Sequence, residues 1–275
     1  MTFKNESVLN FYKELPFNIY GNKESAIEQI KKYNPLEIYP ELKKIFKQYG
    51  KIKIIDFGCG GGWLVNSLSY HLKDKVDVTG VDFNPTVIEY ANEIRSNLNL
   101  KSNFTCSDLF AFKSDFKFDL VISLGVLHHT NNCSEAIKYI AKFVNNNSYL
   151  FLGLYHSYGR RPFLEYFNNM KNKDENFKFN EYKKLHKIVD EKKMYSWFRD
   201  QVLHPHETQH TFEEMIPIFE SIDFKIIATS INKFERIDNF DKIIYQEKKL
   251  ENYSKEKIIN KEYYPGFFIT IGRKN

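Results

Sequence analysis

The sequence predicts an α/β fold in which a mainly parallel sheet is covered by helices on both faces. Between residues 51 and 155, short apolar segments typical of strands alternate with segments whose apolar residues recur at helical spacing. The segment "SYLFLGLY" (148–155) is almost continuously apolar, as expected for a strand buried on both faces. This strict alternation favours a parallel sheet, because parallel neighbours need a crossover connection that is usually a helix.

The first half of the chain predicts its elements in a clear order. Residues 1–49 form amphipathic helices, interrupted by proline and glycine in "ELPFNIYG" and "YNPLEIYP". "KIKIIDF" is then a strand, "WLVNSLSYHL" a helix and "VDVTGVDF" a second strand. Asn84 and Pro85 supply an N-cap and a first-turn proline for the next helix. "NFTCSDLF" and "FDLVISLG" predict two more strands, and "CSEAIKYIAKFV" predicts the helix before "SYLFLGLY".

The alternation ends after Tyr155. Residues 156–210 are polar, aromatic and rich in histidine, and their length predicts an insertion. Thr211 and Glu214 have the spacing of a capping box that opens the helix "TFEEMIPIFESI". "FKIIATSI" and "GFFITIGR" are closing strands, separated by an exposed helical segment at about 235–265. We therefore expect a single domain with four parts: an N-terminal helical cap (1–49), a core (50–155), an insertion (156–210), and a C-terminal helix with closing strands (211–275).

Composition narrows the class of protein. A hydrophobic content of 42% in 275 residues predicts a globular core rather than disorder. The net charge of +5 comes from 40 basic and 35 acidic residues that are interleaved, which indicates a solvated surface rather than a nucleic-acid-binding face. The cysteines Cys59, Cys106 and Cys133 lack CxxC spacing, which argues against a disulfide frame or a cysteine zinc site. Without a signal-like N-terminus or a membrane-length apolar run, we expect a soluble cytoplasmic protein.

A glycine-rich turn, "IIDFGCGGGW" (54–63), follows the first strand. It lacks the lysine and Ser/Thr pair of a phosphate-binding loop. A dinucleotide fingerprint would place its third glycine at position 63, which is Trp63 here. What remains is a strand-end acid, Asp56, followed by glycines at alternate positions.

Four motifs follow one another over roughly residues 50–155: "DFGCGGG", "VDFNP", "CSDLF" and "FDLVISLGVLHHT". In this order and spacing, the sequence resembles the class I S-adenosylmethionine-dependent methyltransferases. The resemblance implies a Rossmann-like sheet of seven strands with the last strand antiparallel, and S-adenosylmethionine as cofactor. It also implies that the N-terminal helices and the insertion lie over the carboxyl ends of the strands, where open α/β sheets bind ligands.

The cofactor residues expected from these motifs have distinct roles. Glycines let the backbone approach the methionine part of the cofactor, and Asp56 can accept a hydrogen bond from its ammonium group, directly or through water. Asp82 ends the second strand, where a carboxylate can accept from both ribose hydroxyls. The resemblance assigns Asp108 to the adenine amino group, although helix capping or loop solvation would also explain Asp56 and Asp108. The full set expected at the cofactor is Asp56, Gly58, Gly60, Gly62, Asp82, Phe83, Asp108, Leu109 and Leu124.

Histidines gather where the acceptor should lie. His128 and His129 follow the fourth strand, and His156 follows the fifth. A hydroxyl acceptor benefits from a base with a pKa near neutrality, for which histidine is suited. We expect His129 to be the base, with His128 or His156 next; the alternative is that these side chains hold loops together by hydrogen bonds.

The stretch "LHPHETQH" (203–210) is interpreted as a polar wall of the acceptor pocket. Its histidines and glutamate would also be a plausible metal-ligand set, but the spacing matches no helical HExxH pattern, so we expect no metal. Arg160 and Arg161 could clamp a carboxylate or phosphate, or form surface salt bridges. The residues expected to contact the acceptor are Tyr20, Tyr155, Arg160, His204, His206, Glu207 and His210.

Together these patterns predict a methyltransferase that acts on a small-molecule acceptor, at oxygen and with a histidine base. The alternatives are an RNA or protein methyltransferase and a non-catalytic cofactor-binding protein. The sequence after the fourth strand, "SLGVLHH", lacks the (Asp/Asn)-Pro-Pro-(Tyr/Phe) signature of nucleobase-amine methylation, and no separate basic domain is evident. We therefore expect neither a nucleic-acid nor a membrane partner.

Overall fold

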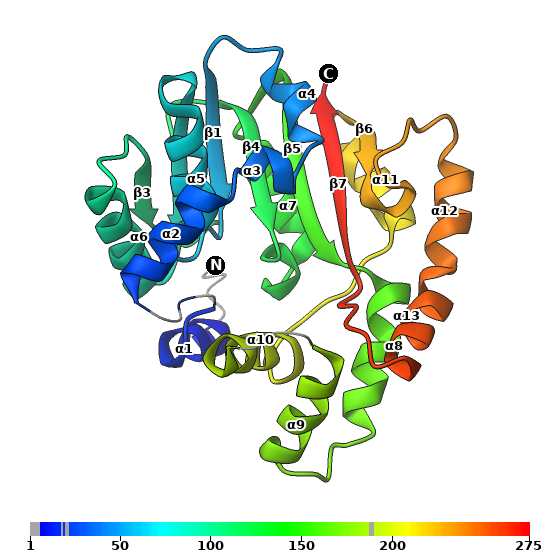
Figure 1. Ribbon diagram of the computed structural model, residues 1–275. Coiled ribbons are helices and arrows are strands. Elements are labelled where there is room, and N and C mark those ends of the chain that lie inside the picture. Colours follow the sequence, from blue (N-terminus) through cyan, green and yellow to red (C-terminus); the bar gives the residue numbers. More distant parts are fainter. Residues whose placement is uncertain (1–5, 18, 20–21, 187–189) are drawn as a thin grey trace.

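A seven-stranded sheet forms the centre of the computed structural model, which describes residues 6–17, 19, 22–186 and 190–275 (Figure 1). The strand order is β3-β2-β1-β4-β5-β7-β6. Strands β1 to β5 are mutually parallel, whereas β7 runs antiparallel to both β5 and β6. The predicted mainly parallel sheet with an antiparallel last strand is thus confirmed. The strands are β1 Ile52–Phe57, β2 Val76–Asp82, β3 Asn103–Cys106, β4 Phe118–Leu124, β5 Val144–Tyr155, β6 Phe224–Thr229 and β7 Phe267–Lys274.

Helices cover both faces of the sheet (Figure 1). One apolar cluster joins α4 and α5 to the sheet, and the other joins α7, α11 and α12 to the opposite face. The α-helices are α1 Glu6–Glu14, α2 Lys23–Lys32, α3 Pro35–Ile38, α4 Leu42–Phe46, α5 Trp63–Leu72, α6 Pro85–Asn97, α7 Cys133–Ala141, α8 Ser157–Asn168, α9 Glu175–Leu185, α10 Glu191–Val202, α11 Phe212–Ser221, α12 Phe240–Lys248 and α13 Leu250–Ile259. Three short 3-10 helices are η1 Lys73–Lys75, η2 Leu127–His129 and η3 Ser230–Asn232.

Local sequence signals account for several element boundaries. The Asn84 side chain accepts from the Thr86 N–H and caps α6, with Pro85 in the first turn. Both halves of the Thr211–Glu214 capping box are formed at the start of α11. The last eight residues of β5 are all buried, as the apolar run predicted.

The third strand is shorter than predicted. β3 ends at Cys106, and Asp108 lies in the turn beyond it rather than at the strand end. The reason is local: the Asp108 side chain accepts from the Phe110 N–H at 2.8 Å, and its carbonyl oxygen accepts from the N–H groups of Ala111 and Phe112. These bonds close a turn, which competes with strand pairing.

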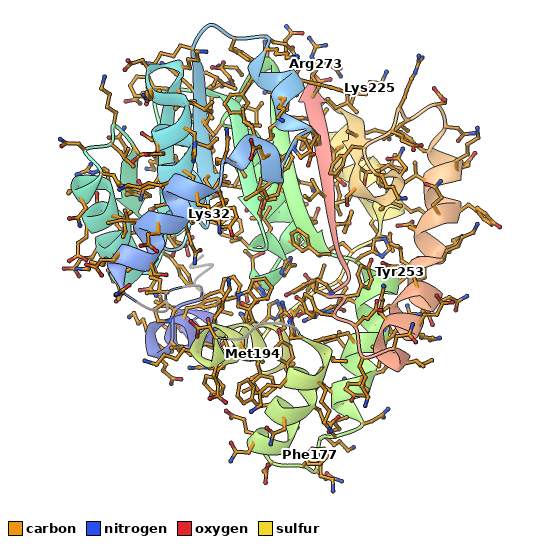
Figure 2. The ribbon with its side chains drawn as sticks, viewed as in Figure 1. Lys32, Phe177, Met194, Lys225, Tyr253 and Arg273 are labelled. Atoms are coloured by element: carbon orange, nitrogen blue, oxygen red, sulfur yellow. The ribbon has the colours of Figure 1, made fainter. Side chains whose placement is uncertain are left out.

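The insertion folds as α8, α9 and α10 beyond the carboxyl ends of the parallel strands. Figure 2 shows Met194 on α10 and Phe177 at the tip of α9, at the opposite end of the molecule from Arg273. Arg273 pairs with Tyr149 near the amino-terminal part of β5, which fixes the direction. The insertion has its own apolar cluster, formed by Phe163, Phe167, Tyr182, Leu185, Met194 and Phe198.

Two expectations about the surrounding helices need correction. Of the N-terminal helices, α1 lies at the carboxyl ends of the strands, where Asn84 Nδ2 donates to the Tyr12 carbonyl oxygen at 3.1 Å. Helices α2 and α3 instead pack against α5, and α4 joins the same face of the sheet through Leu42 and Ile45, which are buried in the apolar cluster there. The segment between the closing strands is helical but not fully exposed, since Glu247 on α12 is completely buried.

Across the described ranges, the structure contains no helix with the length and apolar character needed to cross a membrane.

Candidate active site at the carboxyl ends of the strands

The glycine-rich turn after β1 is open on one side and tightly packed on the other. Gly58, Gly60 and Gly62 all have positive φ values. A Cβ built at Gly60 would meet no atom within 4 Å, whereas one at Gly62 would lie 2.7 Å from the side chains of Ala91 and Phe104. The turn therefore leaves room for a ligand beside Gly60 while it holds α5 close to its neighbours.

Two buried carboxylates lie beside this turn. Asp56 is the last residue but one of β1 and pairs in register with Gly80 of the adjacent strand β2, which ends at Asp82. Asp82 accepts from the backbone N–H groups of Gly60 and Asn84, both at 2.9 Å. Burial raises the pKa of Asp82, and the two backbone bonds oppose that shift. Asp82 is thus fixed against the glycine turn, and carboxylate lone pairs remain for a further donor.

Asp56 differs from Asp82 in its surroundings. Its side chain is 5% exposed, and within the described ranges its carboxylate has neither a hydrogen bond nor an ion pair. Burial, followed by the charge of Asp82, raises the pKa of Asp56 to about 8. A buried acid of this kind is complementary to a cationic ligand group, which would restore its usual ionisation.

The remaining residues expected at the cofactor lie along the same edge. Phe83 follows β2, and Leu124 ends β4, where it pairs in register with Gly153. Gly125 next to it has a φ of 76°, and a Cβ there would meet nothing within 4 Å. Asp108 is half-buried in its turn, and Leu109 packs against the apolar cluster.

These residues fit S-adenosylmethionine. The space at Gly60 and Gly125 leaves room at the strand ends, Asp56 offers a carboxylate to an ammonium group, and Asp82 offers one to ribose hydroxyls. The bond that the Asp108 side chain makes in its own turn is the loop role anticipated as the alternative for this residue, and one carboxylate oxygen remains for another donor.

A cluster of three histidine rings lies where the acceptor is expected. His128 and His129 come from η2, and His204 comes from the loop after α10. The ring centroids of His129 and His204 are 3.7 Å apart, and those of His128 and His129 are 4.3 Å apart. His128 is fully buried and His129 is 5% exposed, so this cluster is a desolvated group of imidazoles.

Backbone hydrogen bonds fix the tautomer of each ring. His129 Nδ1 lies 2.9 Å from the carbonyl oxygen of His206, which can only accept, so this Nδ1 carries the hydrogen. The Nδ1 atoms of His128 and His204 instead accept from the N–H groups of Tyr155 and His206, at 3.3 and 3.1 Å. In the neutral state the Nε2 of His129 is therefore a lone pair, whereas the Nε2 of His128 and of His204 is an N–H.

Each of these three Nε2 atoms is buried and has no hydrogen-bond partner among the described residues. Burial lowers the pKa of His129, while Asp200 and the bond to His206 oppose that shift. Asp200, which is buried on α10, accepts from the Tyr12 hydroxyl at 2.6 Å. Unpartnered buried nitrogens are rare in folded proteins, and they mark this cluster as a place for a ligand.

His156 has a different environment from the other two candidate bases. Its Nε2 lies 2.8 Å from the carboxylate of Glu247, and its Nδ1 accepts from the Gly159 N–H at the start of α8. The same carboxylate accepts from the backbone N–H groups of Phe212 and Glu213 at the start of α11. Both ring nitrogens of His156 are therefore engaged in joining α8, α11 and α12, which is the loop-holding alternative.

Arg160 and Glu207 are also engaged with each other. Arg160 is fully buried and donates to both carboxylate oxygens of Glu207, at 2.9 and 2.7 Å. It also donates to the Gln201 carbonyl oxygen at 2.7 Å, and its guanidinium lies 3.9 Å from the centroid of the Tyr155 ring. Arg160 thus forms an internal ion pair that fastens the loop 203–211 to α8.

The loop 203–211 is fastened by further bonds. His206 Nε2 donates to the Thr130 carbonyl oxygen at 3.0 Å, and His210 pairs with His156 in an isolated parallel bridge. Of the predicted wall residues, His204 belongs to the histidine cluster with His128 and His129. His206, Glu207 and His210 instead hold the loop in place through the bonds just described. In the portion of the chain that the structure describes, no three His, Cys, Asp or Glu side chains are placed to hold a metal ion.

Two of the residues predicted to contact the acceptor, Tyr155 and Tyr20, remain to be placed. Tyr155 lies against His128, with ring centroids 4.3 Å apart, so its ring packs inside the cluster. Tyr20 lies outside the described residues. Sequence reasoning missed Asp200. Its neighbours in space, Tyr12 on α1 and His129 on η2, lie far from it in the sequence, so no local motif marks it. The Tyr12 hydroxyl on α1 donates to Asp200.

Comparison with known proteins identifies a family for this chain. A family model described as a methyltransferase domain matches residues 49–220, which is more than half of the chain. Ubiquinone biosynthesis O-methyltransferases from Rickettsia akari and Coxiella burnetii are 28% identical over 132 residues and 30% identical over 125 residues. These matches cover 46% and 44% of this chain, and 51% and 52% of the relatives. The chain thus spans about half the length of these curated relatives.

Solved structures show the same fold at low identity. Magnesium protoporphyrin IX methyltransferase from Synechocystis PCC 6803 with bound SAM is 15% identical with a TM-score of 0.55, and the match covers 100% of both chains. PKMT2 from Rickettsia typhi is 16% identical with a TM-score of 0.61, covering 94% of this chain and 54% of that one. At such identities the likeness concerns the fold alone.

Proposed function

The chain belongs to the methyltransferase domain family, and we propose that it transfers a methyl group to a hydroxyl oxygen of a small-molecule acceptor, with His129 as the base. It is a class I S-adenosylmethionine-dependent methyltransferase. The observation that carries the proposal is the lone pair at His129 Nε2. Because Nδ1 donates to the His206 carbonyl oxygen, Nε2 is the acceptor nitrogen of the ring, and it has no partner among the described residues. The O-methyltransferase names of the curated relatives support oxygen as the acceptor atom.

The residues divide the work between holding the cofactor and moving a proton. S-adenosylmethionine, when bound, supplies an electrophilic methyl group. Asp56 would accept from its ammonium, Asp82 from its ribose, and the turn at Gly60 would face its methionine part. Asp108, Phe83 and Leu109 would lie around the adenine, and Leu124 would contact the cofactor from the end of β4. His129 Nε2 would take the hydroxyl proton, a contribution of about 10²–10⁴-fold for general-base catalysis.

Replacing Asp82 by alanine should weaken binding of S-adenosylhomocysteine by about 2–4 kcal/mol, because two charge-assisted hydrogen bonds to the ribose would be lost. Asp82→Asn should lose less, since an amide oxygen can still accept from Gly60. Isothermal titration calorimetry measures both. Asp77→Ala, at the other end of the same strand, is the matched control and should bind normally. Unchanged affinity in Asp82→Ala would contradict the ribose assignment.

Binding of the same ligand should release a proton from Asp56. With a pKa of about 8, Asp56 is largely protonated at pH 7, and an ammonium beside it favours the ionised form. Affinity should therefore rise with pH up to about 8, by at most about tenfold per unit. Calorimetry at pH 7 in two buffers of different ionisation enthalpy measures the proton. Asp56→Asn should bind without release; equal release in that variant would assign the proton to another group.

A further inference from the structure

The histidine cluster of His128, His129 and His204 offers a defined pattern of hydrogen-bonding atoms to a bound ligand. Its three free nitrogens are one acceptor, at His129, and two N–H donors, at His128 and His204. The donor of His204 belongs to the ring that lies against His129, with the two ring centroids 3.7 Å apart. A hydroxyl alone satisfies His129 and leaves the neighbouring N–H groups without partners, which costs free energy in a desolvated site.

The atom that meets the His204 N–H should be a pure acceptor. A second hydroxyl would bring its own hydrogen, and within the described part of this cluster the one free acceptor, His129, is already used. A carboxylate would bring a charge next to Asp200, which is buried and bonded to Tyr12. Arg160, a cation close to the cluster, is already paired with Glu207. A neutral carbonyl oxygen meets the donors without either cost.

We propose that the acceptor carries a neutral carbonyl oxygen adjacent to the hydroxyl that is methylated, and that His204 selects this oxygen through its Nε2–H. This inference rests on the proposed function of the site and adds the class of acceptor. In the reaction the O–H bond breaks, its proton goes to His129 Nε2, and the oxygen forms a bond to the methyl carbon. The C–S bond of the sulfonium breaks, with its electron pair left on sulfur.

The surroundings suit a flat acceptor of this kind. The rings of Phe11 and Tyr12 on α1 lie 5.0 and 5.4 Å from the His204 ring, and Tyr155 lies against His128. Because α1 covers His204 and is also bonded to Asn84 beside Asp82, the same helix borders the cofactor site and the cluster. The acceptor reaches the buried nitrogens only when these side chains move aside.

Two isomeric probes test the inference without turnover. Methyl salicylate has its hydroxyl beside the ester carbonyl, and methyl 4-hydroxybenzoate has it on the far side of the ring. Binding to the protein with S-adenosylhomocysteine present should favour methyl salicylate by about tenfold, the value of one well-placed hydrogen bond. In ¹⁵N-histidine NMR spectra, methyl salicylate should shift the Nε2 signals of His129 and His204, and the free protein should show the hydrogen of His129 on Nδ1.

Variants at position 204 make the assignment specific. His204→Phe keeps the stacked ring and lacks the N–H, so the preference between the isomers should fall to about twofold or less. His204→Gln keeps a donor and should retain most of it, and His71→Gln, far from the cluster, should retain all of it. Equal binding of the isomers, no binding of methyl salicylate, tighter binding of catechol, or a hydrogen on Nε2 of His129 would each overturn the inference. Binding of S-adenosylhomocysteine is measured alongside. If it binds while the acceptor inference fails, the methyltransferase assignment still stands; if it does not bind, the methyltransferase assignment itself fails.

Discussion

Replacing His129 by alanine should lower turnover by about 10²–10⁴-fold while leaving cofactor affinity unchanged. The reason is that His129 Nε2 is the free acceptor in the cluster, whereas the cofactor would be held by Asp56 and Asp82 at the glycine turn. Single-turnover measurements with labelled cofactor give the rate, and calorimetry with S-adenosylhomocysteine gives the affinity.

A second variant separates catalysis from support of the loop. In His129→Asn the amide nitrogen can replace Nδ1 as donor to the His206 carbonyl oxygen, but no acceptor replaces Nε2. The asparagine variant should therefore be as inactive as the alanine variant and more stable. If His129→Asn turned over within about threefold of the natural chain, the loop-holding alternative would be correct.

The pH profile supplies an independent check on the same residue. Burial places the pKa of His129 below its ordinary 6.5, so the lone pair persists at that pH and is lost only as the pH falls further. The acid limb of turnover should therefore have its midpoint below 6.5. It should be absent from the residual activity of the asparagine variant.

The sheet could be predicted from the sequence because the signals for its strands are local. Apolar runs, the Asn84–Pro85 cap and the glycine turn each fix backbone geometry within a few residues, and the structure bears them out. The third strand was predicted too long because an aspartate turn competes with pairing at the edge, where few neighbours favour the strand.

The candidate site was only partly accessible to such reasoning. His128 and His129 follow a strand of the core, so topology alone placed them at the ligand-binding edge. His204 differs from His206, and His129 from His156, in which ring nitrogens have hydrogen-bond partners, and these partners are backbone groups and the Glu247 carboxylate. No spacing in the sequence contains that information, and the same holds for Asp200, whose partner Tyr12 lies 188 positions away.

The second large effect concerns Arg160, where the sequence suggested an acceptor clamp. Replacing Arg160 by alanine should lower the free energy of unfolding by about 3–5 kcal/mol, because the Glu207 carboxylate would lose its partner in a site where its side chain is only 9% exposed. The carbonyl oxygen of Gln201 would also lose its donor. Urea unfolding followed by circular dichroism measures the change, provided that the m-value stays constant.

The neighbouring arginine and a double variant distinguish the ion pair from a clamp. Arg161 pairs with Glu251 at the surface, where its side chain is 49% exposed, so Arg161→Ala should cost no more than about 1 kcal/mol. Arg160→Met combined with Glu207→Gln removes both charges together and should recover a large part of the loss, because no unpaired charge remains buried. A clamp predicts the opposite pattern: normal stability in Arg160→Ala, a raised KM for the acceptor, and no recovery in the double variant. The bidentate geometry between Arg160 and Glu207 leads us to expect the first pattern, with the acceptor met by the histidine cluster instead.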